Sequence, residues 1–125
     1  MNAVTKEYIG LAREIKTNIE IRNIDGVFSA VWDTGSTSTT ISDALAKKLG
    51  IKKIAECIQH TVNGSRTAGV YMCDISLGNG LVFNDIEIVD GNFHTDDFLI
   101  GMDIIARGKF VIENIGGSTT MSFSR

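Results

Sequence analysis

Residues that alternate in character at every second position constrain this chain more than any other feature. In the segment 15–22, Ile15, Thr17, Ile19 and Ile21 alternate with charged and amide side chains. A period of two places the first set on one face of a strand. Similar segments recur at a spacing of roughly 8–12 residues, with glycine-containing turns between them. The pattern therefore predicts an all-β barrel or sandwich.

The expected elements follow from this periodicity and from turn chemistry. One helix is expected over 42–50, with Ser42 as its N-cap and Gly50 just past its end. The sequence holds 13 glycines and no proline, so its turns are expected to rely on positive φ. A second, one-turn helix is expected over 103–107, and residues 6–14 fit either a strand or a helical turn. Strands are expected over 15–22, 27–32, 55–62, 67–77, 81–89, 97–101, 109–113 and 119–123, with turns at 23–26, 63–66 and 78–80.

Size and charge limit the possible functions. The 125 residues suffice for one domain, expected to span 1–125. Twelve basic and 15 acidic residues give a net charge of −3, which argues against a nucleic-acid partner. No apolar run reaches 18 residues and no signal peptide is visible, so we expect a cytoplasmic protein that does not span a membrane. Cys57 and Cys73 are expected to be free thiols, with a disulfide between them as the lesser alternative.

One short motif carries candidate chemistry. The segment Ala30–Trp32 is an apolar strand end that runs directly into Asp33-Thr34-Gly35-Ser36. Two interpretations fit the motif alone. Asp33 either caps a turn by accepting from the backbone amides that follow it, or it presents a catalytic carboxylate.

A second motif favours the catalytic interpretation. The segment 30–50, with its Ser/Thr-rich stretch and short helix ending in Leu-Gly, resembles the active-site segment of retropepsin-like aspartic proteases. Leu99, Ile100 and Gly101, followed by Met102-Asp103, are similar to the family's second signature. The resemblance spans about residues 15–115. It implies an all-β, single-lobe acid-protease barrel that is closed and carries one or two short helices.

The resemblance also implies a mechanism. Aspartic proteases hydrolyse peptide bonds with two close carboxylates, of which one keeps a proton while the other activates water. This chain has a single Asp-Thr-Gly, so the second carboxylate must come from Asp33 of another copy. The expected protein is thus a homodimeric aspartic endopeptidase that acts on peptide or protein substrates and needs no cofactor. The alternative is a dimerisation or peptide-binding module of the same fold with little or no activity.

Within the catalytic motif, the resemblance assigns a role to each neighbour of Asp33. Thr34 would hydrogen-bond across the dimer axis. Gly35 would let water and substrate approach the backbone. Ser36 would donate to the outer oxygen of Asp33.

Outside that motif, a flap that closes on substrate is expected within 61–70, and a plain hairpin is the alternative. Residues 119–123 are the candidate interface strand, and an edge strand of the chain's own sheet is the alternative. Val31, Val62 and Ile100 are candidates to line substrate pockets, but core packing is favoured for each. A metal site from Cys57, His60, Cys73 and His94 is disfavoured because the second pair is not closely spaced and all four fall on alternating strands. The expected flap residues are Asn63, Gly64, Ser65 and Gly69.

Overall fold

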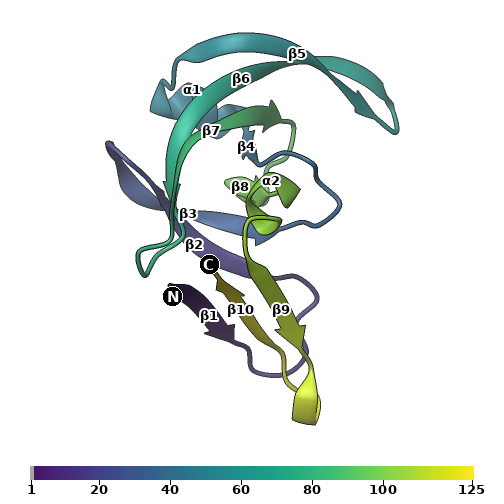
Figure 1. Cartoon of the computed structure of the whole chain (residues 1–125). Coiled ribbons are helices and arrows are strands. Elements are labelled where there is room, and N and C mark those ends of the chain that lie inside the picture. Colours follow the sequence, from purple (N-terminus) through teal and green to yellow (C-terminus); the bar gives the residue numbers. More distant parts are fainter. Residues whose placement is uncertain (1) are drawn as a thin grey trace.

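The computed structural model describes residues 2–125 and consists mostly of strands (Figure 1). Two short α-helices and one 3₁₀ turn interrupt them. In chain order the elements are β1 (Ala3–Glu7), β2 (Lys16–Ile21), β3 (Ile24–Trp32), β4 (Thr40–Ser42), α1 (Asp43–Leu49), β5 (Lys53–Thr61), β6 (Gly64–Ser76), β7 (Val82–Gly91), β8 (Phe98–Ile100), α2 (Met102–Ile105), β9 (Lys109–Glu113), η1 (Ile115–Gly117) and β10 (Thr120–Ser124).

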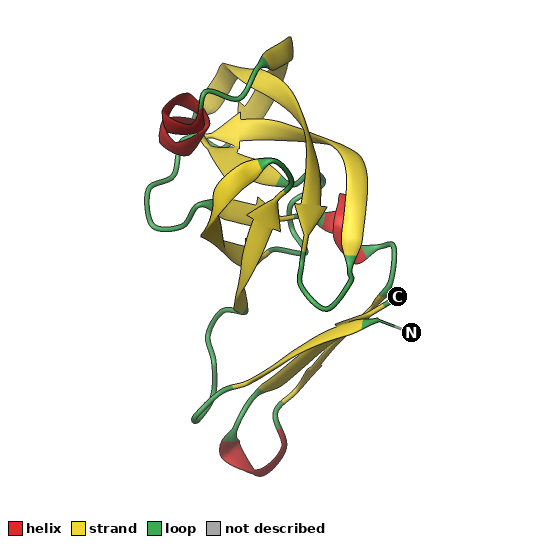
Figure 2. Cartoon of the chain, turned by 90° about the vertical axis from the view of Figure 1, so that its left-hand side faces the viewer, coloured by secondary structure: helices red, strands yellow, loops and turns green. Residues whose placement is uncertain are grey.

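The strands form two sheets. The larger has the order β2-β3-β8-β4-β7-β6-β5, and an additional pairing of β2 with β6 closes six of its strands into a barrel. The smaller sheet has the order β1-β10-β9 and lies below the barrel in both views (Figure 2). The expectation of an all-β closed barrel with one or two short helices is confirmed, and the barrel carries two.

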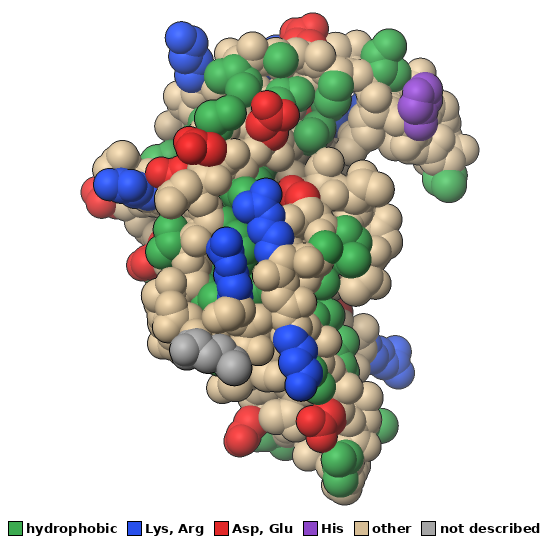
Figure 3. All heavy atoms as spheres, viewed as in Figure 1, with side chains coloured by type: hydrophobic (Ala, Val, Ile, Leu, Met, Phe, Trp, Pro, Cys, Tyr) green, Lys and Arg blue, Asp and Glu red, His purple; other side chains and the backbone are tan. Residues whose placement is uncertain are grey.

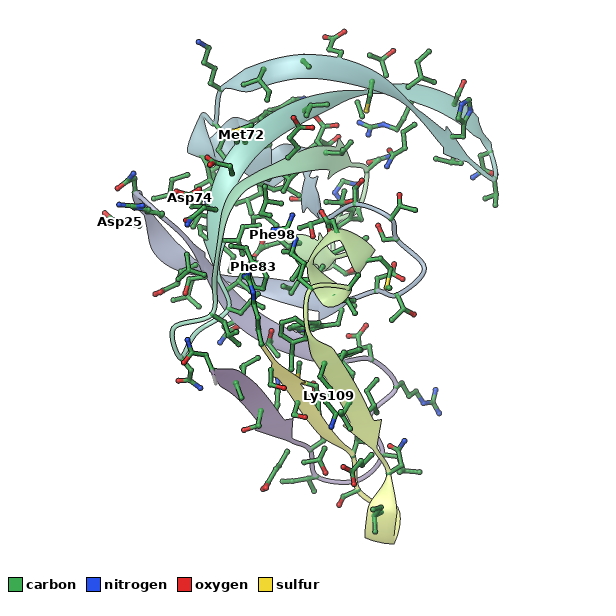
Figure 4. All side chains as sticks on the ribbon, viewed as in Figure 1. Asp25, Met72, Asp74, Phe83, Phe98 and Lys109 are labelled. Atoms are coloured by element: carbon green, nitrogen blue, oxygen red, sulfur yellow. The ribbon has the colours of Figure 1, made fainter. Side chains whose placement is uncertain are left out.

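Alternation explains which side chains fill the barrel. Ile19 and Ile21 of β2 are buried, whereas Asn18 and Glu20 between them are exposed. Phe83 and Phe98 are also fully buried and lie inside the barrel in Figure 4. The smaller sheet is tied to the same core, because Phe123 of β10 packs its ring against Trp32 at a centroid distance of 5.2 Å and against Phe83 at 6.3 Å.

The capping and turn signals hold. The Ser42 side chain accepts from the Leu45 amide at the start of α1, and Gly50 ends the helix in the left-handed conformation. A positive φ occurs at Gly10, Gly26, Gly50, Gly64, Gly78, Gly80, Gly116 and Gly117, as the glycine-rich, proline-free composition predicted. Both cysteines are free, so the disulfide alternative is wrong.

Several elements differ from the expectations, and the short strand β4 was not expected at all. The ambiguous N-terminal segment yields β1 over Ala3–Glu7, followed by a loop rather than by a helical turn. The turn expected at 63–66 consists of only two residues, Val62 and Asn63, because β5 ends at Thr61 and β6 begins at Gly64. The segment 119–123 is not an edge strand. As β10, it pairs with β1 on one side and β9 on the other, so it has no free edge for a second chain.

Neither α1 nor α2 is long and apolar enough to cross a lipid bilayer, and the same holds for every helical segment within residues 2–125.

Candidate active site

The end of β3 delivers Asp33 to the surface. Trp32 is buried, and its indole nitrogen donates to Thr17 Oγ1 at 2.9 Å. This hydrogen bond fixes the end of β3 just before the loop. The backbone amide of Asp33 then donates to the Ile100 carbonyl at 2.8 Å. Asp33 itself is half-buried, and Thr34 and Gly35 after it are exposed. The carboxylate is therefore held at a defined place with one side open to solvent.

The loop after Asp33 is a tight turn. The Gly35 amide donates to Asp33 Oδ1 at 2.9 Å, and the Ser36 amide donates to the Asp33 carbonyl at 3.1 Å. One oxygen of Asp33 thus does cap the turn, while Oδ2 receives no protein donor within residues 2–125. The expected contact from Ser36 is not formed, because Ser36 Oγ donates to the Ser38 carbonyl at 2.7 Å instead.

The second motif lies directly against this loop. β8 runs between β3 and β4, parallel to β3 and antiparallel to β4. Gly101 follows β8, and a Cβ there would lie 2.6 Å from the Ser38 carbonyl carbon and 2.9 Å from the Ser36 oxygen. The next residue, Met102, donates its amide to the Ser36 carbonyl at 2.8 Å. Gly101 is therefore glycine because the two chain segments touch through their backbones.

A hydrogen-bonded pair that the sequence analysis did not assign supports the same loop. Asp103 accepts from the Thr39 amide at 2.9 Å and from the Thr39 hydroxyl at 2.7 Å. The Thr39 hydroxyl oxygen in turn accepts from the Gly101 amide at 3.1 Å. Thr39 is fully buried. In the sequence, Asp103 was marked only by the Gly-x-Asp continuation and Thr39 only by the Ser/Thr-rich stretch. The two residues lie 64 positions apart, so nothing local indicated that they pair.

The candidate flap is the β5–β6 hairpin, which arches over the barrel in Figure 1. Thr61 pairs with Gly64, so Val62 and Asn63 form the tip. Val62 is fully exposed, and therefore the favoured reading of it as a core residue is wrong. Gly64 has a φ of +123°, and Ser65 beside it is exposed. The tip residues Asn63, Gly64 and Ser65 thus lie together, away from the barrel core.

Gly69 has a different place, at the base of the hairpin. Its φ is not positive, so it supplies no unusual backbone conformation. Its amide donates to Asp90 Oδ2 at 3.0 Å, and a Cβ would lie 2.7 Å from that oxygen. The Tyr71 hydroxyl donates to the same oxygen at 2.9 Å, and Arg66 Nη2 donates to Asp90 Oδ1 at 3.0 Å. Arg66 Nη1 also donates to the Asp90 carbonyl at 2.8 Å. Gly69 is therefore a close-packing position, not a source of flexibility.

Burial and the Asp90 carboxylate shift the pKa of the Tyr71 hydroxyl. Burial, and secondly the hydrogen bond to Asp90, raise the pKa of the Tyr71 hydroxyl above its ordinary value. Two residues further on, burial raises the pKa of the Cys73 thiol to about 11, with the Asp74 charge as the second cause. Both groups therefore keep their protons to a higher pH than they would in an unfolded chain.

A cleft separates the loop from the hairpin. One cavity of about 360 Å³ is lined by Gly35 and Ser36 on one side and by Cys57 and Gln59 of β5 on the other. A second, of about 430 Å³, extends from Ser36 to Asn63 and Arg66. Figure 3 shows the hairpin overhanging the body with a hollow beneath its tip. Val31 and Ile100 do not line these cavities; Ile100 is fully buried in the core.

The described part of the chain contains no group of three or more His, Cys, Asp or Glu side chains placed to hold a metal ion. Cys57 and His60 lie on β5, and Cys73 is buried on β6.

The comparisons with known proteins agree with this geometry. The family model for gag-polyprotein putative aspartyl proteases matches residues 10–107. A retropepsin-like aspartic protease from Rickettsia conorii superposes with a TM-score of 0.64 at 22% identity, covering 97% of this chain and 93% of that one. The simian foamy virus protease superposes with a TM-score of 0.55 at 20% identity, covering 74% of this chain and 92% of that one.

These two structural likenesses concern the fold, since both sequences are less than a quarter identical to this one. No curated protein matches the sequence. The family match covers most of the chain and includes both the Asp33 motif and the Gly101 motif. The chain belongs to the gag-polyprotein aspartyl protease family, and its fold is that of the retropepsin-like aspartic proteases.

Proposed function

We propose that this protein is an aspartic endopeptidase in which Asp33 and Asp33 of a second copy share one catalytic water. The observation that carries the proposal is the position of Asp33: half-buried, at the end of a fixed strand, beside a cleft roofed by a hairpin. The family match supports the reaction class.

The chemistry requires two carboxylates. When two acids lie within a few ångströms, they cannot both ionise, so one holds a proton. The ionised member accepts a proton from water, and the protonated member donates a hydrogen bond to the scissile carbonyl. In this chain the Gly35 amide occupies Asp33 Oδ1. Oδ2 is then the oxygen left to face the partner carboxylate and water.

The neighbouring residues have supporting roles in this proposal. Thr34 is exposed at the front of the loop, where it would hydrogen-bond the second copy. Gly35 lines the cleft and leaves room for substrate backbone. An extended peptide would lie between the loop and the hairpin, and the tip at Val62 and Asn63 would close over it and exclude water.

The test is a comparison of the wild type with Asp33→Asn. The asparagine keeps an oxygen that can accept from the Gly35 amide, so the loop keeps its shape while the ionisable group is lost. Both proteins are incubated with a diverse peptide mixture from pH 4 to 8, and new termini are identified by mass spectrometry. We expect the variant to lose activity by roughly a thousandfold with an unchanged melting temperature. Equal cleavage by both proteins would contradict the proposal.

The capping role of Asp33 favours one alternative. Because Oδ1 organises the turn by itself, Asp33 has a structural function even without catalysis. A peptide-binding module without activity would account for that. It predicts that the wild type binds peptides of the mixture in calorimetry and cleaves none of them at any pH.

A further inference from the structure

The larger cavity beneath the hairpin has walls of different chemistry. It begins at Ser36 of the candidate catalytic loop and has a volume of about 430 Å³. Its roof is the β5–β6 hairpin, from which Gln59 and Arg66, directly opposite each other on the two strands, line the cavity. The half-buried side chains of Phe93 and Leu99 supply apolar surface. A side chain that enters the hollow visible in Figure 3 therefore meets both polar and apolar groups.

The guanidinium of Arg66 is held in place and still has unused donors. Its Nη1 donates to Gln59 Oε1 at 3.1 Å and to the Asp90 carbonyl at 2.8 Å, and its Nη2 donates to Asp90 Oδ1 at 3.0 Å. A guanidinium carries further N–H groups, on Nε and at the second position of Nη2. Within residues 2–125 these have no acceptor. Because the side chain is 29% exposed, they remain within reach of a ligand in the cavity.

The side chain of Gln59 is oriented by the same contact. Since its Oε1 accepts from Arg66, its Nε2 is the end left for other partners, and no acceptor for it exists in the described part of the chain. The carboxylate of Asp90 is already engaged. Its Oδ1 accepts from Arg66, and its Oδ2 accepts from the Gly69 amide and the Tyr71 hydroxyl. The Gln59–Arg66 pair therefore presents hydrogen-bond donors to the cavity.

The other polar groups of the cavity do not reverse this character. The hydroxyls of Ser36, Thr40 and Thr61 line it, and each donates its hydrogen to a backbone carbonyl of the protein. Asn63 and Asn92 each carry an amide, which can donate or accept and so does not decide the preference. The hydrogens left for a bound side chain thus come chiefly from the roof.

We propose that this cavity binds a substrate side chain that ends in a carboxylate or a carboxamide, glutamate or glutamine, and that Gln59 and Arg66 select it. The acceptor oxygen lies against the N–H groups of Gln59 and Arg66, and the CH₂ groups lie against Phe93 and Leu99. An aliphatic side chain leaves these donors without a partner once the hairpin excludes water. A lysine brings a second cation beside Arg66. This inference rests on the proposed function and names its substrate class.

The shared site doubles the requirement. A two-fold axis between the two Asp33 residues places one such cavity on each side of the scissile bond. An extended peptide crosses both cavities, so side chains with an acceptor oxygen are expected at two positions, one before the cleaved bond and one after it.

Substitution of Gln59 tests the assignment. Gln59→Glu keeps an oxygen that accepts from Arg66 but replaces the amide donor by a second oxygen, so this position changes from donor to acceptor at constant size. Cleavage of the peptide mixture first locates the enriched positions, and matched peptides then carry Glu, Gln, Leu or Lys there. For the wild type we expect kcat/KM of the Glu or Gln peptide to exceed that of the Leu peptide about tenfold or more. The advantage of Glu over Leu should be lost in the variant.

Two further variants separate donor loss from charge. Gln59→Leu removes the donor without adding a charge, and should reduce the advantage of Glu and of Gln alike. Ala55→Glu is the matched control, because it adds the same charge to the same strand at an exposed position outside both cavities. Its preference among the peptides should stay within about twofold of the wild type, since solvent screens a charge at the surface.

The outcomes separate this inference from the proposed function. Cleavage without enrichment of acceptor side chains, or a preference that both Gln59 variants leave unchanged, would overturn the inference while the protease assignment stands. If the wild type cleaves nothing, its binding of the same matched peptides is measured by calorimetry. Tighter binding of the Glu and Gln peptides, lost in Gln59→Glu, then supports the selective cavity and contradicts the proposed activity. Neither cleavage nor binding contradicts both.

Discussion

The two walls of the cleft are held in different ways. The wall that carries Asp33 is fixed along its length. Main-chain hydrogen bonds join it to Ile100 and Met102, and Asp103 accepts two hydrogen bonds from Thr39 in the same loop. The wall formed by the β5–β6 hairpin is fixed at its base, through Asp90 and through the pairing of β6 with β7. Its tip at Val62 is fully exposed. The difference indicates one rigid wall, which holds the Asp33 carboxylate in place, and one wall whose tip is exposed to solvent.

The largest effect is expected at the rigid wall, from Gly101→Ala. The added methyl would overlap the backbone of Ser38 at 2.6–2.7 Å, and backbone cannot rotate away as a side chain can. We expect a loss of about 3 kcal/mol in the free energy of unfolding, measured by urea denaturation, together with loss of cleavage. Thr37→Ala, in the same loop but exposed, is the control and should change stability by less than about 0.5 kcal/mol. A near-neutral Gly101→Ala would mean that this wall is not rigid.

A smaller effect is expected at the base of the hairpin. Asp90→Ala leaves the Gly69 amide and the Tyr71 hydroxyl buried without an acceptor, and should cost about 2–3 kcal/mol. Asp90→Asn keeps one acceptor oxygen and loses chiefly the contact with Arg66, so about 1 kcal/mol is expected. Equal losses for the two variants in chemical denaturation would show that the hydrogen bonds to Oδ2 do not anchor the hairpin.

The pH dependence of the unfolding free energy tests the same part of the hairpin, where Cys73 is buried. The folded-state pKa of Cys73 is about 11, raised from 9.0. Below pH 9 the thiol is protonated in both states, so its contribution to stability is complete there. As the pH rises from 9 to 11, the unfolded chain loses the proton first, and stability falls.

The expected loss from Cys73 over this window is about 1–2 kcal/mol. Tyr71 adds to the decline from pH 10 upward, because its pKa is also raised. Cys73→Val fills similar space without a titrating proton, and its unfolding free energy should fall less between pH 9 and 11. Parallel curves for the two proteins would show that Cys73 is not closed off in the folded state.

The smallest stability effect is expected at the hairpin tip. Val62→Ser removes an apolar side chain that contacts solvent, so the unfolding free energy should change by less than about 0.5 kcal/mol. If the tip closes on substrate, KM should nevertheless rise several-fold. An unchanged KM for peptide cleavage would favour the plain hairpin over the flap. Gly101→Ala thus tests the rigidity of the wall that carries Asp33, and Val62→Ser tests the role of the hairpin tip.

Local signals in the sequence were sufficient for much of the fold. The helix with Ser42 and Gly50 at its ends was predicted because capping involves only residues within a turn of each other. β9 was predicted with its observed bounds, and most other strands to within a few residues, because alternation is a local property. Asp33 and Gly101 were found as motif residues, since each sits in a recognisable short segment.

Contacts between distant segments were not predicted. Nothing near Thr39 in the chain indicates that its partner is Asp103, and nothing near Arg66 indicates Asp90. The contact of Ser36 was assigned wrongly because the direction of a hydroxyl depends on which acceptors surround it in space. Gly69 was assigned to the flap because a glycine's sequence neighbours do not show what its missing Cβ would touch.

By itself, the sequence determined that this chain is a set of short strands with one Asp-Thr-Gly motif, and from that motif it predicted half of an aspartic-protease site. Only the tertiary structure decided which strand edge stays open. β9 and β10 are both strands of five residues, and strand propensity does not specify which neighbours a strand receives. Pairing with β1 encloses β10 and leaves β9 outermost, because the order of strands in a sheet is settled by long-range packing around a shared core.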